Sequence, residues 1–232
     1  MNKIAVVTGT RAEYGLLKPL IKVLHEFEGF ELQLMATAMH LSPLYGMTVN
    51  EIEKDGFPII RKIECLNGDD SAVGISKSIS IALASFSVAF EELKPDLVII
   101  LGDRSEMLAV ATAASMANIP IAHIHGGETT EGAYDESIRH AITKMSYLHF
   151  TSTEVYRKRV IQLGESPERV FNVGALSLDS IKKLPLMSKD EFEDSINFKL
   201  GDKTALITYH PVTLENSTSK KQFQSILNSL DQ

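Results

Sequence analysis

The amino-acid sequence predicts a doubly wound α/β fold, in which helices cover both faces of a parallel sheet. Short and continuous apolar runs such as Lys3–Thr8 and Asp96–Leu101 are typical of strands that are buried on both faces. Between such runs, segments such as Arg11–Glu26 carry apolar residues at helical spacing. Because strands alternate with helices along the chain, we expect a Rossmann-like domain with a parallel sheet.

Each element of this domain is predicted from the period of its apolar residues. Strands are expected where apolar residues follow one another without a break, and helices where they recur every three or four positions. The expected strands are Lys3–Thr8, Phe30–Ala38, Pro58–Leu66, Asp96–Leu101, Pro120–Ile124, Leu148–Thr151 and Arg169–Val173. The expected helices are Arg11–Glu26, Met47–Asp55, Ala72–Leu93, Ser105–Ala117, Glu136–Tyr147 and Glu154–Leu163.

The organisation of the sequence changes near residue 180. Proline residues and a charged run indicate a connector with some helix over residues 181–203. Thr204–Tyr209 is predicted to be another buried strand, and Lys220–Leu230 has a helical pattern. One β-α unit cannot bury its own apolar face. We therefore expect either that it packs on the first domain (1–180) or, preferably, that 204–232 begins an incomplete second Rossmann-like domain of a longer protein.

Composition limits the classes of partner. The net charge of −7 and the lack of a basic cluster argue against nucleic acid. The single cysteine, Cys65, allows no internal disulfide, which fits a reducing cytoplasm. The first apolar run is too short for a signal sequence, and no later run approaches the length of a membrane span, so no membrane partner is expected.

Charged or titratable residues follow most of the predicted strands, at the edge where open α/β sheets bind ligands. Arg11 and Arg104 lie where helices begin, and a bound anion between them would explain two cations at positive helix ends. Simpler interpretations remain open. Thr10 and Glu13 match a capping box, Asp103 could cap the next helix, both arginines could be surface charges, and His40 could be a hydrogen-bonded loop residue.

The segment IAHIHGGETTEGAYDESIRH, residues 121–140, is the most charged of these strand ends. His123 and His125 would face the same way on a strand and could bind zinc with Glu128 or Asp103, although His123 could equally be a buried strand residue. The glycines at 126 and 127 favour a functional role for His125 and Glu128. Asp135 and Arg139 are neighbours on a helix and form either a solvated ion pair or an acid beside a phosphate-binding arginine.

Several common site types are unsupported by the sequence. GTRAEYG does not have the glycine spacing of a dinucleotide-binding turn, and no P-loop motif is present. The G-x-S-x-G motif is absent, and Cys65 lies inside a predicted strand, so a nucleophilic hydrolase is disfavoured.

Taken together, GTRAEYG, GDRSEM, HIHGGE with DESIRHAITK, and TYHPVT resemble the UDP-N-acetylglucosamine 2-epimerase family, in its hydrolysing branch of sialic-acid and nonulosonate synthesis. The resemblance implies the N-terminal half of a glycosyltransferase-B-like fold in a cytoplasmic homo-oligomer. It implies conversion of UDP-GlcNAc and water to N-acetylmannosamine and UDP. The implied chemistry eliminates UDP with loss of the C2 proton and hydrates the resulting glycal, without a metal or redox cofactor.

Matching positions imply roles for individual residues. The implied acid/base or other catalytic residues are Asp103, His125, Glu128, Asp135 and His210, and the implied substrate contacts are Arg11, His40, Arg104 and Arg139. His125 departs from relatives that have glutamate there. Histidine can act as a base near neutral pH, and the change could instead mark another sugar, such as UDP-2,4-diacetamido-2,4,6-trideoxyglucose.

Two rival functions are a non-hydrolysing epimerase, which keeps UDP attached to the sugar, and a non-catalytic nucleotide-sugar-binding module. The family's second domain continues past the length of this chain and supplies much of the uridine and diphosphate site. If 232 residues were the complete product, we would expect weak or absent turnover.

Overall fold

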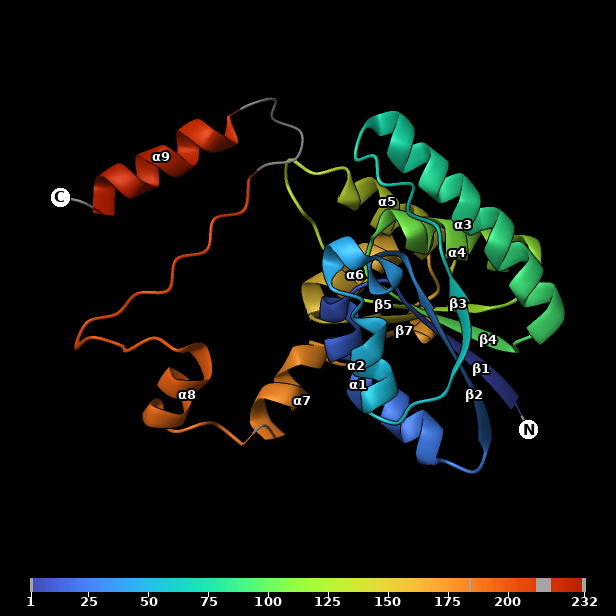
Figure 1. Cartoon of the computed structure of the whole chain (residues 1–232). Coiled ribbons are helices and arrows are strands. Elements are labelled where there is room, and N and C mark those ends of the chain that lie inside the picture. The colour runs from blue at the N-terminus through green and yellow to red at the C-terminus, as the bar shows by residue number, and fades with distance from the viewer. Residues whose placement is uncertain (1, 184, 212–217, 231–232) are drawn as a thin grey trace.

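A computed structural model describes residues 2–183, 185–211 and 218–230, and it confirms the predicted parallel sheet (Figure 1). The strands pair in the order β3-β2-β1-β4-β5-β6-β7, and each pairing is parallel. They are β1 (Asn2–Thr8), β2 (Phe30–Thr37), β3 (Ile59–Ile63), β4 (Leu97–Leu101), β5 (Ile121–Ile124), β6 (Leu148–Thr151) and β7 (Val170–Asn172).

The helices between these strands begin and end within a few residues of the predicted bounds. They are α1 (Arg11–Glu26), α2 (Val49–Lys54), α3 (Ala72–Leu93), α4 (Ser105–Met116), α5 (Asp135–Met145) and α6 (Glu154–Gln162). Short 3-10 turns lie at Ala38–Leu41, Pro43–Tyr45 and Pro167–Arg169. Three further helices follow the sheet, namely α7 (Leu176–Lys183), α8 (Lys189–Ile196) and α9 (Ser219–Leu230).

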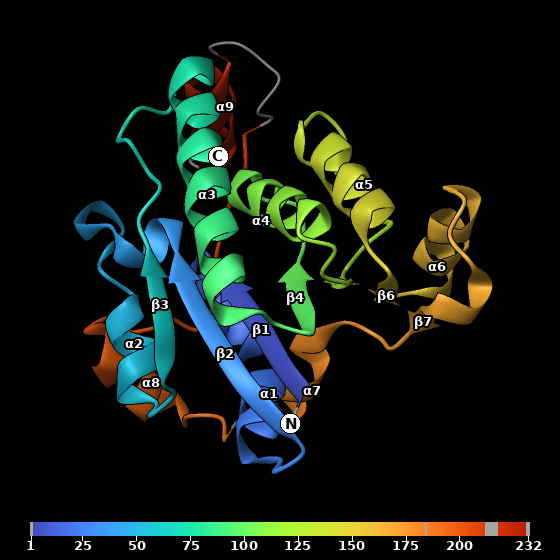
Figure 2. The same ribbon diagram turned by 90° about the vertical axis from the view of Figure 1, so that its right-hand side faces the viewer.

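Two separate apolar cores lie on the two faces of the sheet. On β1, Ala5 and Val7 belong to the core that includes α3 and α4, whereas Ile4 and Val6 belong to the core that includes α1 and α2. Successive residues of a strand point to opposite faces, so a continuous apolar run serves both cores. Figure 2 shows α3, α4 and α5 side by side over one face. The prediction of a doubly wound sheet is therefore confirmed.

The order of the strands reverses beside β1. Its neighbours are β2 on one side and β4 on the other, so the loops that follow β1 and β4 start from adjacent strands at the same edge of the sheet. A reversal of this kind is where open α/β sheets bind ligands. The loops after β4, β5 and β6 also leave from this edge, because all the strands are parallel.

One expectation about apolar length was wrong. Among the described residues, α3 is long and apolar enough to cross a membrane by length and composition. Serines and a glycine interrupt its apolar residues, and this hides its length when the sequence is searched for unbroken runs. Core helices of globular domains have similar composition, and α3 packs Ala82, Phe86 and Phe90 into the same core as Met35.

The strand predicted at Thr204–Tyr209 is not formed. Residues 203–211 have no regular secondary structure, and Leu206 is 95% exposed. A strand needs a hydrogen-bonded neighbour, and Figure 1 shows the coloured part of the chain that follows α8 running apart from the sheet. The expected helix is present as α9, but none of its described side chains is buried. The expected division of the chain into domains stays a prediction, and α7 spans its first boundary at residue 180.

Candidate active site

A buried arginine on α5 gathers three of the predicted site residues. The Arg139 Nη2 atom donates to Oδ2 of Asp103, and Nη1 donates to the His125 carbonyl oxygen at 3.0 Å and to Glu128 Oε2 at 3.4 Å. Asp103 follows β4, and His125 and Glu128 follow β5. A guanidinium can hold several acceptors at once in a fixed geometry. The strand-end residues therefore meet around one cation, and Arg139 does not stand free.

The position of Asp103 is fixed from the neighbouring strand. His123 on β5 is fully buried, and its Nε2 atom lies 2.7 Å from the Gly102 carbonyl oxygen, which can only accept a hydrogen bond. Its Nδ1 atom lies 3.1 Å from Thr143 Oγ1. Burial lowers the pKa of His123 to about 3, so the ring is neutral at physiological pH. The interpretation of His123 as a buried strand histidine is confirmed.

Asp103 has the electrostatics of an acid/base candidate. Its pKa is raised above the ordinary aspartate value, chiefly by burial, with further contributions from the Asp135 and Glu128 carboxylates, while Arg139 opposes the shift. A raised pKa brings a carboxyl group closer to the range in which it can exchange a proton near neutral pH.

His125 does not continue the strand that precedes it. Strand β5 ends at Ile124, and His125 has a left-handed backbone with φ of 63°. Its backbone N–H donates to the Phe150 carbonyl at 2.8 Å, and its own carbonyl accepts from Arg139, so the conformation is held at both ends. The expectation that His123 and His125 face the same way assumed that both lie on the strand, and His125 lies beyond its end.

The His125 ring faces Glu128. Its Nδ1 atom lies 3.5 Å from Glu128 Oε1, and its Nε2 atom is buried without a hydrogen-bond partner among the described residues. Burial lowers the pKa of His125, while the Glu128 carboxylate opposes this effect and Arg139 adds to it. The imidazole is thus neutral near pH 7, as a proton acceptor must be.

The structure adds two residues that the sequence did not point to. Ser152, directly after β6, donates from Oγ to Glu128 Oε1 at 2.6 Å. Arg159 on α6 donates from Nη1 to the Gly127 carbonyl and to Thr129 Oγ1, each at 2.5 Å. Ser152 could have been found by examining the carboxyl end of β6 like the other strand ends. Arg159 has no such signal, because its role depends on how α6 packs against the loop.

The two arginines expected to hold an anion are paired with carboxylates instead. Arg11 is 73% exposed at its side chain and contacts Glu51 at 3.1 Å. The Arg104 Nε atom donates to Oε1 of the buried Glu106 at 2.6 Å. Their role as phosphate contacts stays a prediction.

The start of α1 is closed by its own side chains. The capping box of Thr10 and Glu13 is confirmed, and Glu13 Oε2 also accepts from the Gly9 N–H at 2.8 Å. Glu13 lies buried beside Glu106, and burial followed by the Glu106 charge raises its pKa to about 7. The backbone N–H groups of Gly9 and Thr10, just before α1, thus both donate to the Glu13 carboxylate.

Asp103 as a helix cap and His40 as a hydrogen-bonded loop residue were the simpler interpretations of these two side chains, and the structure treats them differently. The N-cap of α4 is Arg104 and lacks a side-chain cap, so the alternative role of Asp103 as the cap is wrong. His40 is fully buried, and its ring nitrogens contact Thr8 Oγ1 at 3.1 Å and Thr48 Oγ1 at 2.8 Å. Burial lowers its pKa to about 4. This geometry favours the hydrogen-bonded loop histidine over a substrate contact.

The remaining predicted residues lie at the margin of the cluster. Asp135 begins α5, half-buried, and its charge acts on Asp103. Within the described part of the chain, the ion pairs of Arg139 are with Asp103 and Glu128, not with Asp135. His210 is exposed, and no hydrogen bond or ion pair recorded for the described residues joins it to the cluster.

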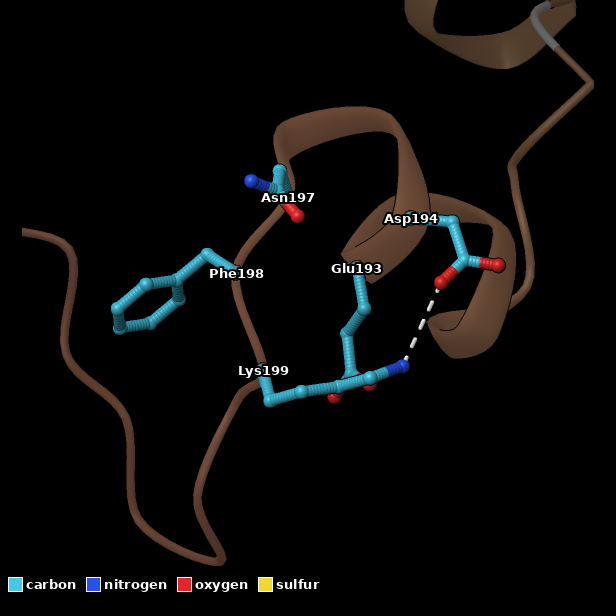
Figure 3. Close-up of a pocket in the computed structure, with 5 residues that line it drawn as sticks. All are labelled: Glu193, Asp194, Asn197, Phe198 and Lys199. Atoms are coloured by element: carbon cyan, nitrogen blue, oxygen red, sulfur yellow. Dashed lines mark hydrogen bonds and ion pairs between the residues drawn. The ribbon is translucent and has the colours of Figure 1, made fainter.

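Two hollows lie away from the cluster. One, of about 350 Å³, is lined by residues of α8 and the turn after it, and Lys199 there pairs with Glu193 at 3.0 Å and Asp194 at 3.4 Å (Figure 3). Another, of about 290 Å³, is lined only by apolar side chains of α1, β1, β4, β5 and β6 and of residues near α7. In residues 2–183, 185–211 and 218–230, no three His, Cys, Asp or Glu side chains are grouped so as to hold a metal ion.

Comparison with known proteins decides the family. The sequence profile of UDP-N-acetylglucosamine 2-epimerase matches residues 22–232. The chain belongs to this family. The chain is 47% identical over 230 residues to a GDP/UDP-N,N'-diacetylbacillosamine 2-epimerase (hydrolyzing) of Campylobacter jejuni, covering 99% of the chain and 60% of the relative. A UDP-N,N'-diacetylbacillosamine 2-epimerase (hydrolyzing) of Legionella pneumophila is 44% identical, with 98% and 60% covered.

Solved structures of other proteins share the fold of this chain. The UDP-GlcNAc 2-epimerase of Neisseria meningitidis bound to UDP-GlcNAc superposes with a TM-score of 0.70 at 22% identity, covering 84% of this chain and 53% of that one. The chain thus has the N-terminal half of a glycosyltransferase-B-like architecture. It spans about 60% of the length of the curated relatives named above.

Proposed function

We propose that this chain is the acid/base-bearing half of a hydrolysing UDP-sugar 2-epimerase. The observation that carries the proposal is the arrangement of Asp103, His125 and Glu128 around Arg139 at the carboxyl ends of β4 and β5. This arrangement supplies neutral and charged groups of different proton affinity in one place, as proton transfer at carbon requires.

The reaction begins with removal of the proton at C2 of the sugar. The electrons of that C–H bond form a C1–C2 double bond as the C1–O bond breaks, and UDP leaves with the bonding pair. Water then adds to the glycal, and C2 receives its proton on the opposite face. His125 and Asp103 are the groups we assign to proton transfer, with Asp135 beside them and His210 brought from the C-terminal segment. No redox step occurs, so no redox cofactor is needed.

We assign diphosphate binding to Arg104 and Arg11. Arg104 is the N-cap of α4 and follows β4, and β4 is paired with β1 at the reversal of strand order. A diphosphate competes with the Glu106 carboxylate for its guanidinium, and it competes likewise with Glu51 for Arg11. Arg139 remains with Asp103 and Glu128 and balances their charge, so we assign it to the sugar side of the site.

The substrate we favour carries acetamido groups at C2 and C4. The relatives at 47% and 44% identity are described as hydrolysing N,N'-diacetylbacillosamine 2-epimerases, whereas a Neisseria meningitidis relative described as UDP-N-acetylglucosamine 2-epimerase is 32% identical. N,N'-diacetylbacillosamine is 2,4-diacetamido-2,4,6-trideoxyglucose. UDP-GlcNAc is the alternative substrate. We also propose that the protein acts in the cytoplasm as a homo-oligomer.

A product analysis tests this function. The chain, and the chain extended by the remaining C-terminal part of the Campylobacter jejuni relative, are each incubated with both UDP-sugars, and products are separated by chromatography. The proposal predicts free 2-epimerised sugar and UDP, with the diacetamido substrate preferred and the extended protein faster. A product that still carries UDP identifies a non-hydrolysing epimerase. UDP binding by calorimetry without turnover in either protein identifies a binding module.

A further inference from the structure

Glu128 has its two carboxylate oxygens engaged by different partners. Oε1 accepts from Ser152 Oγ at 2.6 Å and faces His125 Nδ1 at 3.5 Å, while Oε2 accepts from Arg139 Nη1 at 3.4 Å. Ser152, His125 and Arg139 come from three different segments of the chain, after β6, after β5 and on α5. Both oxygens of this carboxylate are thus occupied, and contacts from three segments of the chain fix its orientation.

The surroundings of His125 select one neutral form of its ring. Neutral imidazole carries one N–H, and the nitrogen nearer a carboxylate takes it, because an ionised carboxylate only accepts. Nδ1 faces Glu128, whereas Nε2 has no hydrogen-bond partner among the described residues. Placing the proton on Nε2 would leave a buried donor unpaired and turn a bare nitrogen toward a negative charge. The gap of 3.5 Å is typical of catalytic pairs in ligand-free proteins, which shorten when substrate binds.

We propose that Ser152 and Glu128 are positioning residues for His125. They hold the imidazole as its Nδ1–H form and leave the lone pair on Nε2 to accept the substrate proton. Ser152 orients the Glu128 carboxylate, Glu128 orients the ring, and Arg139 fixes the His125 backbone. This deepens the proposed function by assigning the base to His125 and an orienting role to Glu128, and only the identity of the transferred proton rests on that function.

The left-handed backbone of His125 supports this assignment. A non-glycine residue at φ of 63° is uncommon and is retained where the surroundings impose it. Here the N–H bond to Phe150 and the Arg139 bond to the carbonyl impose it. With this backbone conformation, the imidazole ring lies beside Glu128, and its Nδ1 atom is 3.5 Å from Oε1. The charged and titratable groups that face this ring are Glu128, Arg139 and the neutral His123.

Nitrogen-15 NMR of histidine-labelled, ligand-free chain tests the proposal without turnover. The His125 signals are assigned by their loss in H125N among the seven histidines. We expect the proton on Nδ1 and a bare Nε2 at pH 8. In S152A, a measurable fraction of the His125 rings should carry the proton on Nε2. S152T keeps the hydroxyl and should show the native signals. E128Q removes the charge that raises the pKa of His125, so that pKa should fall, whereas E131Q, an exposed control in the same loop, should leave it unchanged.

A proton on Nε2 in the native chain overturns the proposal, as do His125 signals that are the same in native, S152A and E128Q proteins. The native spectrum alone decides the first point, even where a variant does not fold. Because this measurement uses no nucleotide sugar, its result is independent of UDP release. Failure of the UDP assay with the predicted spectrum rejects the enzymatic function and leaves the positioning arrangement standing.

Discussion

His123 Nε2 donates to the Gly102 carbonyl oxygen at 2.7 Å and so ties strand β5 to the loop that carries Asp103. The bond is buried, and the histidine is neutral because burial lowers its pKa to about 3. His123, which resembles a metal ligand in the sequence, thus stabilises the loop next to the site.

Replacing His123 by leucine removes this donor and leaves the Gly102 carbonyl without its partner. An unpaired buried polar group costs about 1–3 kcal/mol, so we expect H123L to lower the free energy of unfolding by this amount, measured by urea denaturation. H123Q keeps a side-chain N–H and should lose less. An H123L protein as stable as the native chain would show that this bond contributes nothing to the free energy of unfolding.

Gly127 lies too close to α6 to accept a side chain. A Cβ there would approach the Tyr156 carbonyl oxygen to 2.6 Å and Val160 Cγ2 to 2.8 Å, and φ is 80°. Gly46 has a similar φ of 84° but open space around it, so G46A measures the backbone cost alone, about 1 kcal/mol. We expect G127A to lower the thermal midpoint by clearly more than G46A. Equal shifts would mean that the loop bearing Glu128 does not depend on its contact with α6.

Arg139 balances the charges of Asp103 and Glu128 in a poorly solvated place. Removing one partner of a buried ion pair costs about 3–5 kcal/mol, because the other charge stays buried. R139M should therefore be strongly destabilised, and R139M/D103N should recover part of the loss. R139K should not restore the native stability, since an ammonium group cannot present the guanidinium geometry. The measurement is a double-mutant cycle in urea, and additive costs would contradict the contact.

Much of this cluster could be predicted from the sequence, because the carboxyl ends of parallel strands must meet at one edge. Asp103, His125 and Glu128 were placed together in this way, and the helices and strands up to β7 followed from apolar period. The partners of Arg11 and Arg104 were not predictable. Glu51 comes from α2, and Glu106 turns inward from α4, so only packing brings them into contact.

The strand predicted at Thr204–Tyr209 failed for a related reason. Its apolar pattern resembles that of β4, but a strand also needs a neighbour to accept and donate its backbone hydrogen bonds. The spacing of apolar residues indicates which side chains are suited to burial, but it does not show which other elements cover them. Ser152 lies at the carboxyl end of β6 and could have been considered with the other strand-end residues, but its hydrogen bond to Glu128 appears only in the structure.

Glu13 predicts a specific pH dependence of stability. Its pKa is about 7 in the folded chain against 4.5 for the ordinary group, so the folded state holds the proton more tightly. Its contribution is full below pH 4.5 and is lost as pH rises toward 7, by about 3 kcal/mol. E13Q mimics the protonated form. We expect the stability of E13Q relative to native chain to rise between pH 5 and 7.5, with the exposed E26Q as control, and a constant difference would contradict the shifted pKa.

In the function proposed above, the strand-end cluster moves the C2 proton of a UDP-sugar as UDP leaves. The most direct measurement follows the reaction by proton NMR in D₂O, with the native chain extended by the C-terminal part of the Campylobacter jejuni relative and with its D103N and H125N forms. We expect free 2-epimer carrying deuterium at C2, together with UDP, and a loss of both products of at least about a hundredfold in either variant. Retention of the original hydrogen at C2, or native rates in both variants, would contradict it.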